Sequence, residues 1–190
     1  MDELTLLARA AGRGDRAALA RLVRETQGDV WRLCAHLVDP ATADDLTQDT
    51  YLRAIPALRR FRGDAPVRVW LLTIARRACA AEIAARSRDR QLSAKLAAVP
   101  VDAVLGQPPA EPGVQAAADE LLSVLEPDRR AAFILTQMLG CSYAEAAAVC
   151  GCPVGTIRSR VARAREDLVA VVADRDVSPA RSPSAGDACN

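Results

Sequence analysis

The chain has 190 residues, of which 51% are apolar and 26% are charged, and its formal net charge is +1. The apolar content is ample for buried cores, the charged content is ordinary for a soluble protein, and the length suits one domain or two small ones. The N-terminus lacks a basic segment followed by an apolar core, and the longest uncharged run, residues 131–144, is too short and too polar to cross a bilayer. We therefore expect no signal peptide, no membrane insertion and a cytoplasmic location.

Helical periodicity dominates the first half of the chain, and no run of alternating polar and apolar residues is long enough to indicate a strand. The first predicted helix is capped by Asp15 and continues to about Leu37. Two more helices are expected at residues 43–58 and 69–86, and Leu46 and Leu52 of the first of these can pack inward. Asp15 suits the cap because its carboxylate can accept hydrogen bonds from the free backbone N–H groups of the first turn. The predicted fold class is all-α.

Changes in composition divide the chain into two small helical domains. We place the first at residues 1–92 and a flexible linker at residues 93–114, where proline and glycine are frequent. The second domain spans residues 115–173, with breaks expected at Pro127, Gly140 and Gly151. The tail at residues 174–190 is rich in serine and proline and is expected to be disordered.

Charge is unevenly distributed along the chain. Residues 53–90 contain ten arginines and three acidic residues, a balance of +7. Residues 119–152 contain five acidic residues and two arginines, a balance of −3, and residues 153–168 return to +2 with four arginines and two acidic residues. Two basic segments separated by an acidic one indicate two separate contacts with a polyanion.

The segment 152–165 is the most informative stretch of the chain. Pro153 fits the first turn of a helix, and Gly151 fits a turn that joins it to the Ala-rich helix before it. On a helical wheel the apolar residues form one stripe, and the opposite side carries small residues flanked by arginines. The apolar stripe consists of Val154, Ile157, Val161, Ala164 and Leu168. This pattern is typical of a helix-turn-helix that reads the DNA major groove, although a solvated surface helix that only carries charge is the alternative.

Three stretches in order resemble the extracytoplasmic-function (ECF) sigma factors, the small two-domain class of bacterial RNA polymerase sigma subunits. Residues 44–54 resemble the helix that docks on the polymerase clamp, and residues 60–64 with 70–77 resemble the promoter-melting segment. Residues 142–165 resemble the helix-turn-helix that reads the −35 element, most closely that of the actinobacterial sigma C group. The resemblance implies a protein that directs promoter-specific initiation of transcription.

The resemblance also implies partners and contact residues. The partners are core RNA polymerase, at its β′ clamp and β flap, and promoter DNA, and an anti-sigma factor is a further candidate because such control is common in the family. The implied −35 contacts are Tyr143, Thr156, Arg158, Ser159, Arg160, Ala162, Arg163 and Arg165. The implied −10 and melting residues are Arg60, Phe61, Arg62, Trp70, Arg76 and Arg77. The implied polymerase-binding residues are Asp44, Asp45, Leu46, Gln48 and Asp49.

Some of these roles have a structural alternative. Asp44 and Asp45 would stabilise the first turn of a helix even without a partner. Phe61 and Trp70 suit the core at least as well as they suit an unstacked base. Arg77 stands where the family usually has asparagine, so the preference for −10 bases stays open.

No constellation of residues indicates catalysis or a resident cofactor. The sequence has no glycine-rich phosphate loop, nucleophile elbow or cluster of metal ligands, so we expect no enzyme activity, no metal and no cofactor. Cys150 and Cys152, with Cys141 nearby, could indicate a metal or thiol sensor. Their one-residue spacing is poor for zinc, and the single histidine, His36, lies in the other domain on an apolar face that suggests a structural role.

Two other function classes compete with the sigma factor interpretation. A stand-alone helix-turn-helix regulator would explain residues 128–168, but it would leave the acidic helix and the N-terminal arginines without a role, and such regulators usually bind palindromes as dimers. An adaptor that binds polymerase without reading DNA would need no basic recognition helix. The sigma factor interpretation accounts for all three segments.

Overall fold

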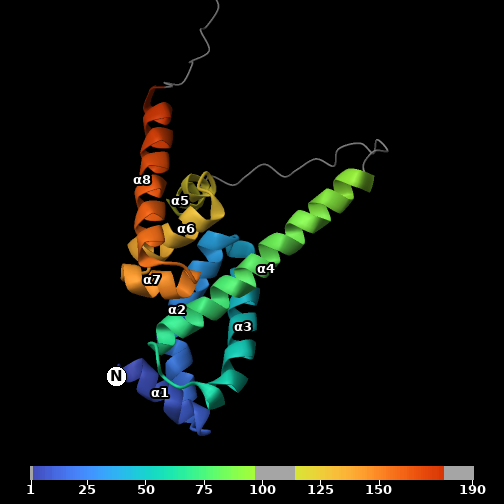
Figure 1. The fold of residues 1–190 in the computed structure, drawn as a ribbon. Helices are drawn as coiled ribbons and strands as arrows, with labels where there is room; N and C mark the ends of the chain where they lie inside the picture. Colours follow the sequence, from blue (N-terminus) through green and yellow to red (C-terminus); the bar gives the residue numbers. More distant parts are fainter. Residues whose placement is uncertain (1, 97–113, 178–190) are drawn as a thin grey trace, which may run out of the picture.

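The computed structural model describes residues 2–96 and 114–177, and Figure 1 shows how they are arranged. Every regular element in these two ranges is helical, which confirms the prediction of an all-α fold. Residues 97–113 of the predicted linker and residues 178–190 of the predicted tail lie outside the described residues. In the described part of the chain, no helix combines the length and apolarity needed to cross a membrane.

The N-terminal helices pack around a shared core. They are α1 (Glu3–Gly12), α2 (Arg16–Leu37), α3 (Pro40–Ala57), the short 3-10 turn η1 (Leu58–Arg60) and α4 (Val67–Leu96). α2, α3 and α4 contact one another and bury Leu22, Leu33 and Leu72 completely. Each of these side chains contributes about 1.5–3 kcal/mol through apolar burial. The predicted cap at Asp15 is confirmed, since its carboxylate accepts the N–H groups of Ala17 and Ala18.

Helix α1 is an element that sequence reasoning missed. Asp2 caps it by accepting the N–H of Thr5 at 2.7 Å. The helix approaches η1 so closely that a Cβ atom on Gly12 would lie 2.5 Å from the carbonyl oxygen of Leu58. Glycine at this position therefore allows α1 to pack against the rest of the domain.

Helix α4 is longer than predicted. It continues to Leu96, past the expected helix end at residue 86 and past the expected start of the linker at residue 93. The residues after Arg86 lack an apolar stripe and are mostly exposed, so periodicity gave no helix signal there. They are nevertheless mainly good helix formers, and an ion pair between Glu82 and Arg86 at 2.7 Å supports the middle of the helix.

The C-terminal helices confirm the predicted breaks. They are α5 (Val114–Ser123), α6 (Pro127–Phe133), the π-helical turn η2 (Ile134–Met138), α7 (Tyr143–Cys150) and α8 (Val154–Val177). Gly140 and Gly151 have φ angles of 66° and 65°, a left-handed conformation that glycine adopts without a steric penalty. α8 extends to Val177, so residues 174–177 are helical rather than part of a disordered tail. No glycine or proline occurs between Gly155 and Pro179 to interrupt this helix.

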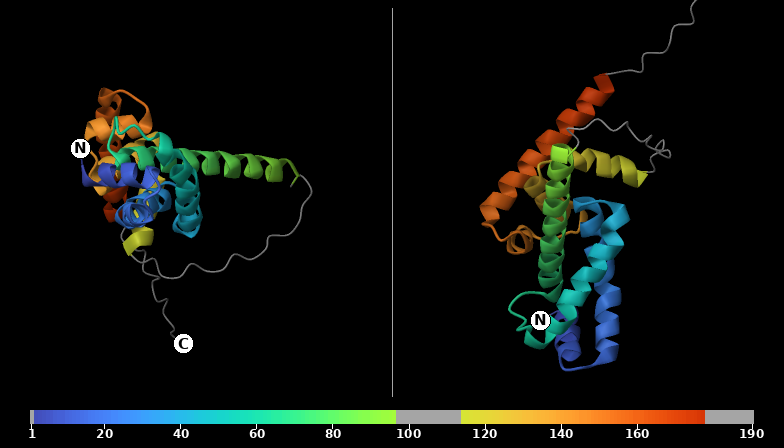
Figure 2. Two further views of the ribbon diagram at one scale, coloured as in Figure 1. Left: turned by 90° about the horizontal axis from the view of Figure 1, so that it is seen from below. Right: turned by 90° about the vertical axis from the view of Figure 1, so that its right-hand side faces the viewer.

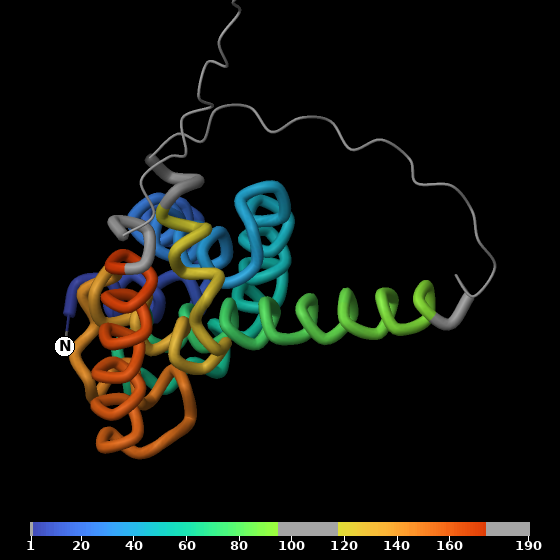
Figure 3. The backbone as a smooth tube through the Cα atoms, turned by 90° about the horizontal axis from the view of Figure 1, so that it is seen from above, coloured from blue at the N-terminus to red at the C-terminus, as the bar shows by residue number. Residues whose placement is uncertain are grey.

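The two sets of helices lie side by side. α4 packs against α7, and α2 contacts α6. Figures 2 and 3 show the C-terminal helices beside the first half of α4, while its second half extends away from the body. His36 at the end of α2 lies 2.7 Å from Asp119 of α5, measured from Nδ1 to Oδ1. The packing therefore includes polar contacts that join the two halves of the chain.

Candidate nucleic-acid and polymerase interfaces

Helix α8 buries one face and presents the other to solvent. Ile157, Val161 and Ala164 are at most 1% exposed, as the helical wheel predicts. Val154 is an exception, since it is 38% exposed in the first turn, where no other element covers it. On the opposite face, Arg158, Ser159, Ala162 and Arg163 are all exposed.

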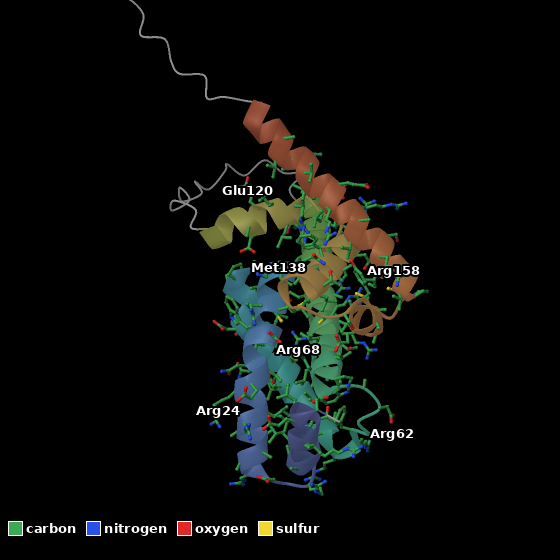
Figure 4. All side chains as sticks on the ribbon, turned by 90° about the vertical axis from the view of Figure 1, so that its left-hand side faces the viewer. Arg24, Arg62, Arg68, Glu120, Met138 and Arg158 are labelled. Atoms are coloured by element: carbon green, nitrogen blue, oxygen red, sulfur yellow. The ribbon has the colours of Figure 1, made fainter. Side chains whose placement is uncertain are left out.

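Arg158 and Arg163 are the arginines of α8 that are available to a ligand. Neither forms an ion pair with any residue that the structure describes. Figure 4 shows Arg158 pointing outward from the start of α8. Small side chains at Ser159 and Ala162 lie between the two arginines along the exposed face. Such a face can approach base edges closely in a major groove, and its guanidinium groups can bind guanine through two hydrogen bonds.

The other predicted −35 residues differ in availability. The guanidinium of Arg160 is half-buried and is held by the carboxylate of Asp128 on α6. Arg165 is exposed and donates from Nη2 to Oε1 of Gln137 at 2.7 Å. Thr156 is half-buried in the first turn of α8, and Tyr143 is 36% exposed at the start of α7.

Local interactions fix both ends of α7. Ser142 and Glu145 form a capping box, in which the N–H of Glu145 donates to the Ser142 hydroxyl and the N–H of Ser142 donates to the Glu145 carboxylate at 2.8 Å. These hydrogen bonds from the Ser142 backbone and hydroxyl hold the pKa of Glu145 below its usual range. Gly151 then ends α7 in the left-handed conformation. The cap therefore fixes the start of α7, and the glycine sets the direction in which α8 leaves α7.

The predicted −10 residues lie around the start of α4. The rings of Phe61 and Trp70 pack at a centroid distance of 5.1 Å, and both are half-buried against the hydrophobic core. Arg60, Arg62 and Arg77 are exposed. Figure 4 shows Arg62 on the segment before α4, far from Arg158 on α8. The two predicted DNA surfaces are therefore separate in this arrangement.

Two arginines of α4 reach into the C-terminal half. Arg76 binds Asp128 at 3.1 Å from Nη2 to Oδ1, so one carboxylate holds both Arg76 and Arg160. Arg68, labelled in Figure 4, binds Asp29 at 2.6 Å and also donates to the carbonyl oxygen of Leu139. These links join residues that are distant along the chain, so no local sequence pattern predicts them.

Helix α3 presents acidic and amide side chains. Asp44, Asp45 and Gln48 are exposed, and Asp44 accepts the indole N–H of Trp31 at 2.9 Å. Asp49 is half-buried and forms an ion pair with Arg53 at 2.8 Å.

Leu46 and Leu52 of α3 have opposite environments, although both were expected to pack inward. Leu46 is 8% exposed, as predicted, whereas Leu52 is 64% exposed. Ile55 is 39% exposed beside it. A cavity of about 340 Å³ lies between α2 and α3 and is lined by Leu52, Ile55 and Gln48 among others. The exposed side of α3 is therefore partly apolar, which is typical of a surface that a protein partner covers.

The described cysteines and the histidine are not gathered into one cluster. Among the described residues, no group of three or more His, Cys, Asp or Glu side chains is arranged to hold a metal ion. Cys150 is half-buried at the end of α7, and burial raises the pKa of its thiol to about 11. Cys152 receives a weak contact from Arg160, with Nη1 3.6 Å from Sγ. His36 is buried, and its Nδ1 is hydrogen-bonded to Oδ1 of Asp119. This contact gives His36 a structural role that requires no ligand.

Comparison with known proteins matches both halves of the chain. The family model for sigma-70 region 2 matches residues 22–89, and the model for sigma-70, region 4 matches residues 115–168. The chain is 47% identical to the ECF RNA polymerase sigma factor SigC of Mycobacterium tuberculosis, covering 89% of this chain and 91% of that protein. It is 33% identical to the RNA polymerase sigma-H factor of Pseudomonas aeruginosa, covering 82% and 86%.

A solved structure has a similar fold. The sigma factor RpoE of Bartonella quintana, crystallised with the anti-sigma factor NepR, has a TM-score of 0.68 and 31% sequence identity. The similarity covers 82% of this chain and 96% of RpoE.

Proposed function

We propose that this chain, which belongs to the ECF family of RNA polymerase sigma factors, reads the upstream promoter element with α8, opens DNA with the start of α4, and binds core polymerase through α3. As a sigma factor, it directs promoter-specific initiation of transcription. The observation that carries the assignment is the exposed face of α8, where Arg158 and Arg163 form no ion pair with a described residue and lie opposite a buried apolar stripe. A helix that only carried surface charge would not need small residues between its arginines.

The −35 contacts divide into two groups. Arg158, Ser159, Ala162 and Arg163 would face the base edges, because they share the exposed side of α8. Arg160, Arg165 and Thr156 lie nearer the edges of this face, and Tyr143 begins α7; these residues would contact phosphates. These phosphate contacts would position α8 without specifying sequence. Arg160 must leave Asp128 before it can make such a contact.

The −10 surface would use charge more than stacking. Arg60, Arg62 and Arg77 are exposed and can follow the phosphates of a separated strand. Phe61 and Trp70 pack on each other and on the core, so they would offer an unstacked base only the edges that remain exposed. Arg76 would join this surface after releasing Asp128.

The polymerase surface would combine acidic and apolar side chains of α3. Asp44, Asp45, Gln48 and Asp49 offer charge and hydrogen bonds to a basic partner, while Leu52 adds apolar area. Leu46 would support the helix from the core side. By the family resemblance, the partner surface is the β′ clamp, and the C-terminal domain would contact the β flap.

The remaining assignments follow from this role. Sigma factors are DNA-recognition proteins without enzyme activity, and we propose that this chain is likewise no enzyme and uses no cofactor, with the chemistry performed by the polymerase. We place it in the cytoplasm, where core polymerase and the chromosome are. Because RpoE of B. quintana binds the anti-sigma factor NepR, we propose that an anti-sigma factor can bind this chain as well. The two-domain division is retained, with the first domain extended to the end of α4.

Transcription with purified core polymerase tests the proposed function. The full chain should give transcripts from a bipartite promoter, whereas core alone should give none at that start site. Arg163→Ala should lower promoter selectivity, and Arg24→Ala, an exposed arginine on α2, should leave it unchanged. Absence of promoter-specific transcripts with the wild-type chain would contradict the proposal.

A further inference from the structure

An interdomain groove runs between α4, the end of α2, and α6. One cavity of about 260 Å³ and a neighbouring cavity of about 220 Å³ share Leu37, Ile83 and Pro127 as lining residues. The first cavity also has Arg86, Arg90 and Arg130 on its walls. The second continues along Ala80, Ala84 and Ala131 and is also lined by Ser87 and by the paired Arg76 and Asp128. The groove is thus basic at one end and mainly apolar along the rest.

Arg130 is the unusual residue at the basic end. Its Nη2 donates to the carbonyl oxygens of Ser123 and Leu125, but its Nε is buried and has no acceptor among the described residues. It forms no ion pair in that part of the chain, and burial lowers the pKa of its guanidinium. A buried donor without an acceptor is costly, so Arg130 gains a hydrogen bond if its side chain moves to bring Nε to an oxygen atom in the groove.

The charge at this end favours a ligand with one negative charge. Arg86 is already paired with Asp39 and Glu82, whereas Arg90 is exposed and donates only to the backbone oxygen of Arg86. The guanidinium groups of Arg86, Arg90 and Arg130 and the carboxylates of Asp39 and Glu82 together carry a net charge of +1. The apolar walls around Ile83 and Ala84 would not suit a highly charged ligand such as a nucleoside triphosphate.

We propose that this groove binds a small amphipathic anion, with its acidic head group at Arg130 and Arg90 and its alkyl chain along Ile83 and Ala84. Ligand sites commonly combine apolar walls with a few polar groups that fix orientation, and this groove has both. Because α4 and α6 both line it, the ligand would hold the two domains in the arrangement in which Asp128 binds Arg76 and Arg160. By favouring that arrangement, the ligand would weaken DNA binding by these two arginines. This consequence rests on the proposed function.

Calorimetric titration of the full chain with decanoate, below its micelle concentration, tests this site. Decanoate should bind with a stoichiometry near one, and decanol, which has the same chain without the charge, should bind at least tenfold more weakly. A decyl phosphate titration distinguishes a phosphate head group from a carboxylate, because the better-suited head group should bind more tightly. No saturable binding of either anion, or equal binding of decanol, would overturn the proposal.

Matched variants locate the binding. Arg130→Gln should weaken decanoate binding at least tenfold, and Ala84→Leu, which fills the exposed apolar wall, should do the same without touching a charged group. Arg24→Gln removes an arginine on another face of α2 and should change nothing. If Arg130→Gln fails to fold, Ala84→Leu alone decides. Equal affinities in Ala84→Leu and wild type would overturn the proposal.

Discussion

Helices α8 and α3 carry the two main proposed contact surfaces, and they differ in how the sequence reveals them. On α8 the apolar residues Ile157, Val161 and Ala164 are buried, and the arginines opposite them are exposed. On α3 the apolar residues are divided, since Leu46 is buried while Leu52 is 64% exposed. The same periodicity argument therefore succeeded on one helix and failed in part on the other.

The difference has a physical origin. A DNA-binding face is polar and basic, so it contrasts with the core face of the same helix. A protein-binding face keeps apolar residues at its centre, so in sequence it resembles a core face. Leu52 looked like a core residue for this reason. The predictions below test whether each surface has the role that its chemistry suggests.

The largest expected effect is on polymerase binding. Leu52→Glu should weaken the affinity for core polymerase by roughly 2 kcal/mol, about thirtyfold, because it places a charge at the apolar centre of the proposed α3 surface. Leu6→Glu is the matched control, since Leu6 is 55% exposed on α1, outside that surface. Fluorescence titration of labelled chain with core polymerase measures both. Equal affinities for the two variants would remove α3 from the interface.

The next effect separates base contacts from phosphate contacts on α8. Arg163→Ala should cost about 1–3 kcal/mol of discrimination between promoter sequences, because a bidentate contact to a base is lost. Arg165→Ala should instead weaken binding to all sequences alike, because a phosphate contact is lost. The slope of log affinity against log salt concentration should become shallower by about one. Holoenzyme binding to matched and mismatched duplexes at several salt concentrations compares them. A loss of discrimination with Arg165→Ala and not with Arg163→Ala would reverse the assignment.

The capping box at the start of α7 should make a smaller, pH-dependent contribution to the stability of the C-terminal domain. Ser142→Ala should destabilise the C-terminal domain by about 1 kcal/mol in urea unfolding near neutral pH. Because the pKa of Glu145 is lowered in the folded protein, its contribution is present above the ordinary glutamate pKa and is lost as the pH falls through the lowered folded value. The difference from wild type should therefore shrink in acid.

Ser123→Ala is the control for this cap. Its hydroxyl donates to a backbone carbonyl within α5 and caps no helix start, so its effect should be smaller and should not follow the titration of Glu145. A Ser142→Ala effect that stayed constant from neutral to acid pH would show that Glu145 does not contribute through the cap.

The smallest effect concerns the Asp128 carboxylate, which joins the two proposed DNA-binding segments. Asp128→Asn should raise the affinity of the free chain for promoter duplex a few-fold, since each exposed ion pair contributes up to about 1 kcal/mol and both Arg76 and Arg160 are released. Asp167→Asn breaks an ion pair to Arg129 within the C-terminal domain and should leave DNA affinity unchanged. Unchanged or lower affinity for Asp128→Asn would show that the shared carboxylate does not restrain these arginines.

Much of the fold could be predicted because its signals are local. The Asp15 cap, the breaks at Gly140 and Gly151, and the buried stripe of α8 all follow from residues within one or two helical turns. The extension of α4 to Leu96 was missed because its exposed residues have no apolar stripe to show periodicity. Helix α1 depends partly on the contact of Gly12 with η1, which a local pattern does not contain.

The candidate surfaces were predicted as residue types on helix faces, but their tertiary partners were not. Arg76 and Arg160 carry the same local signal as Arg158, yet Asp128 holds the first two and leaves the third free. Asp128 belongs to a segment far away in sequence from Arg76, so only packing of α4 beside the C-terminal helices brings them together. The unsatisfied Nε of Arg130 is likewise a consequence of burial between elements.

Selection from a promoter library tests the central claim, that the exposed face of α8 reads the upstream element. Holoenzyme made with wild-type chain, or with Arg158→Ala and Arg163→Ala combined, would transcribe templates that share one downstream element and carry randomised upstream sequences. Sequencing the transcripts should show that the wild type enriches a defined upstream sequence, while the double variant still initiates with little preference. If the double variant enriches the same upstream sequence as strongly as wild type, α8 does not read the promoter through this face.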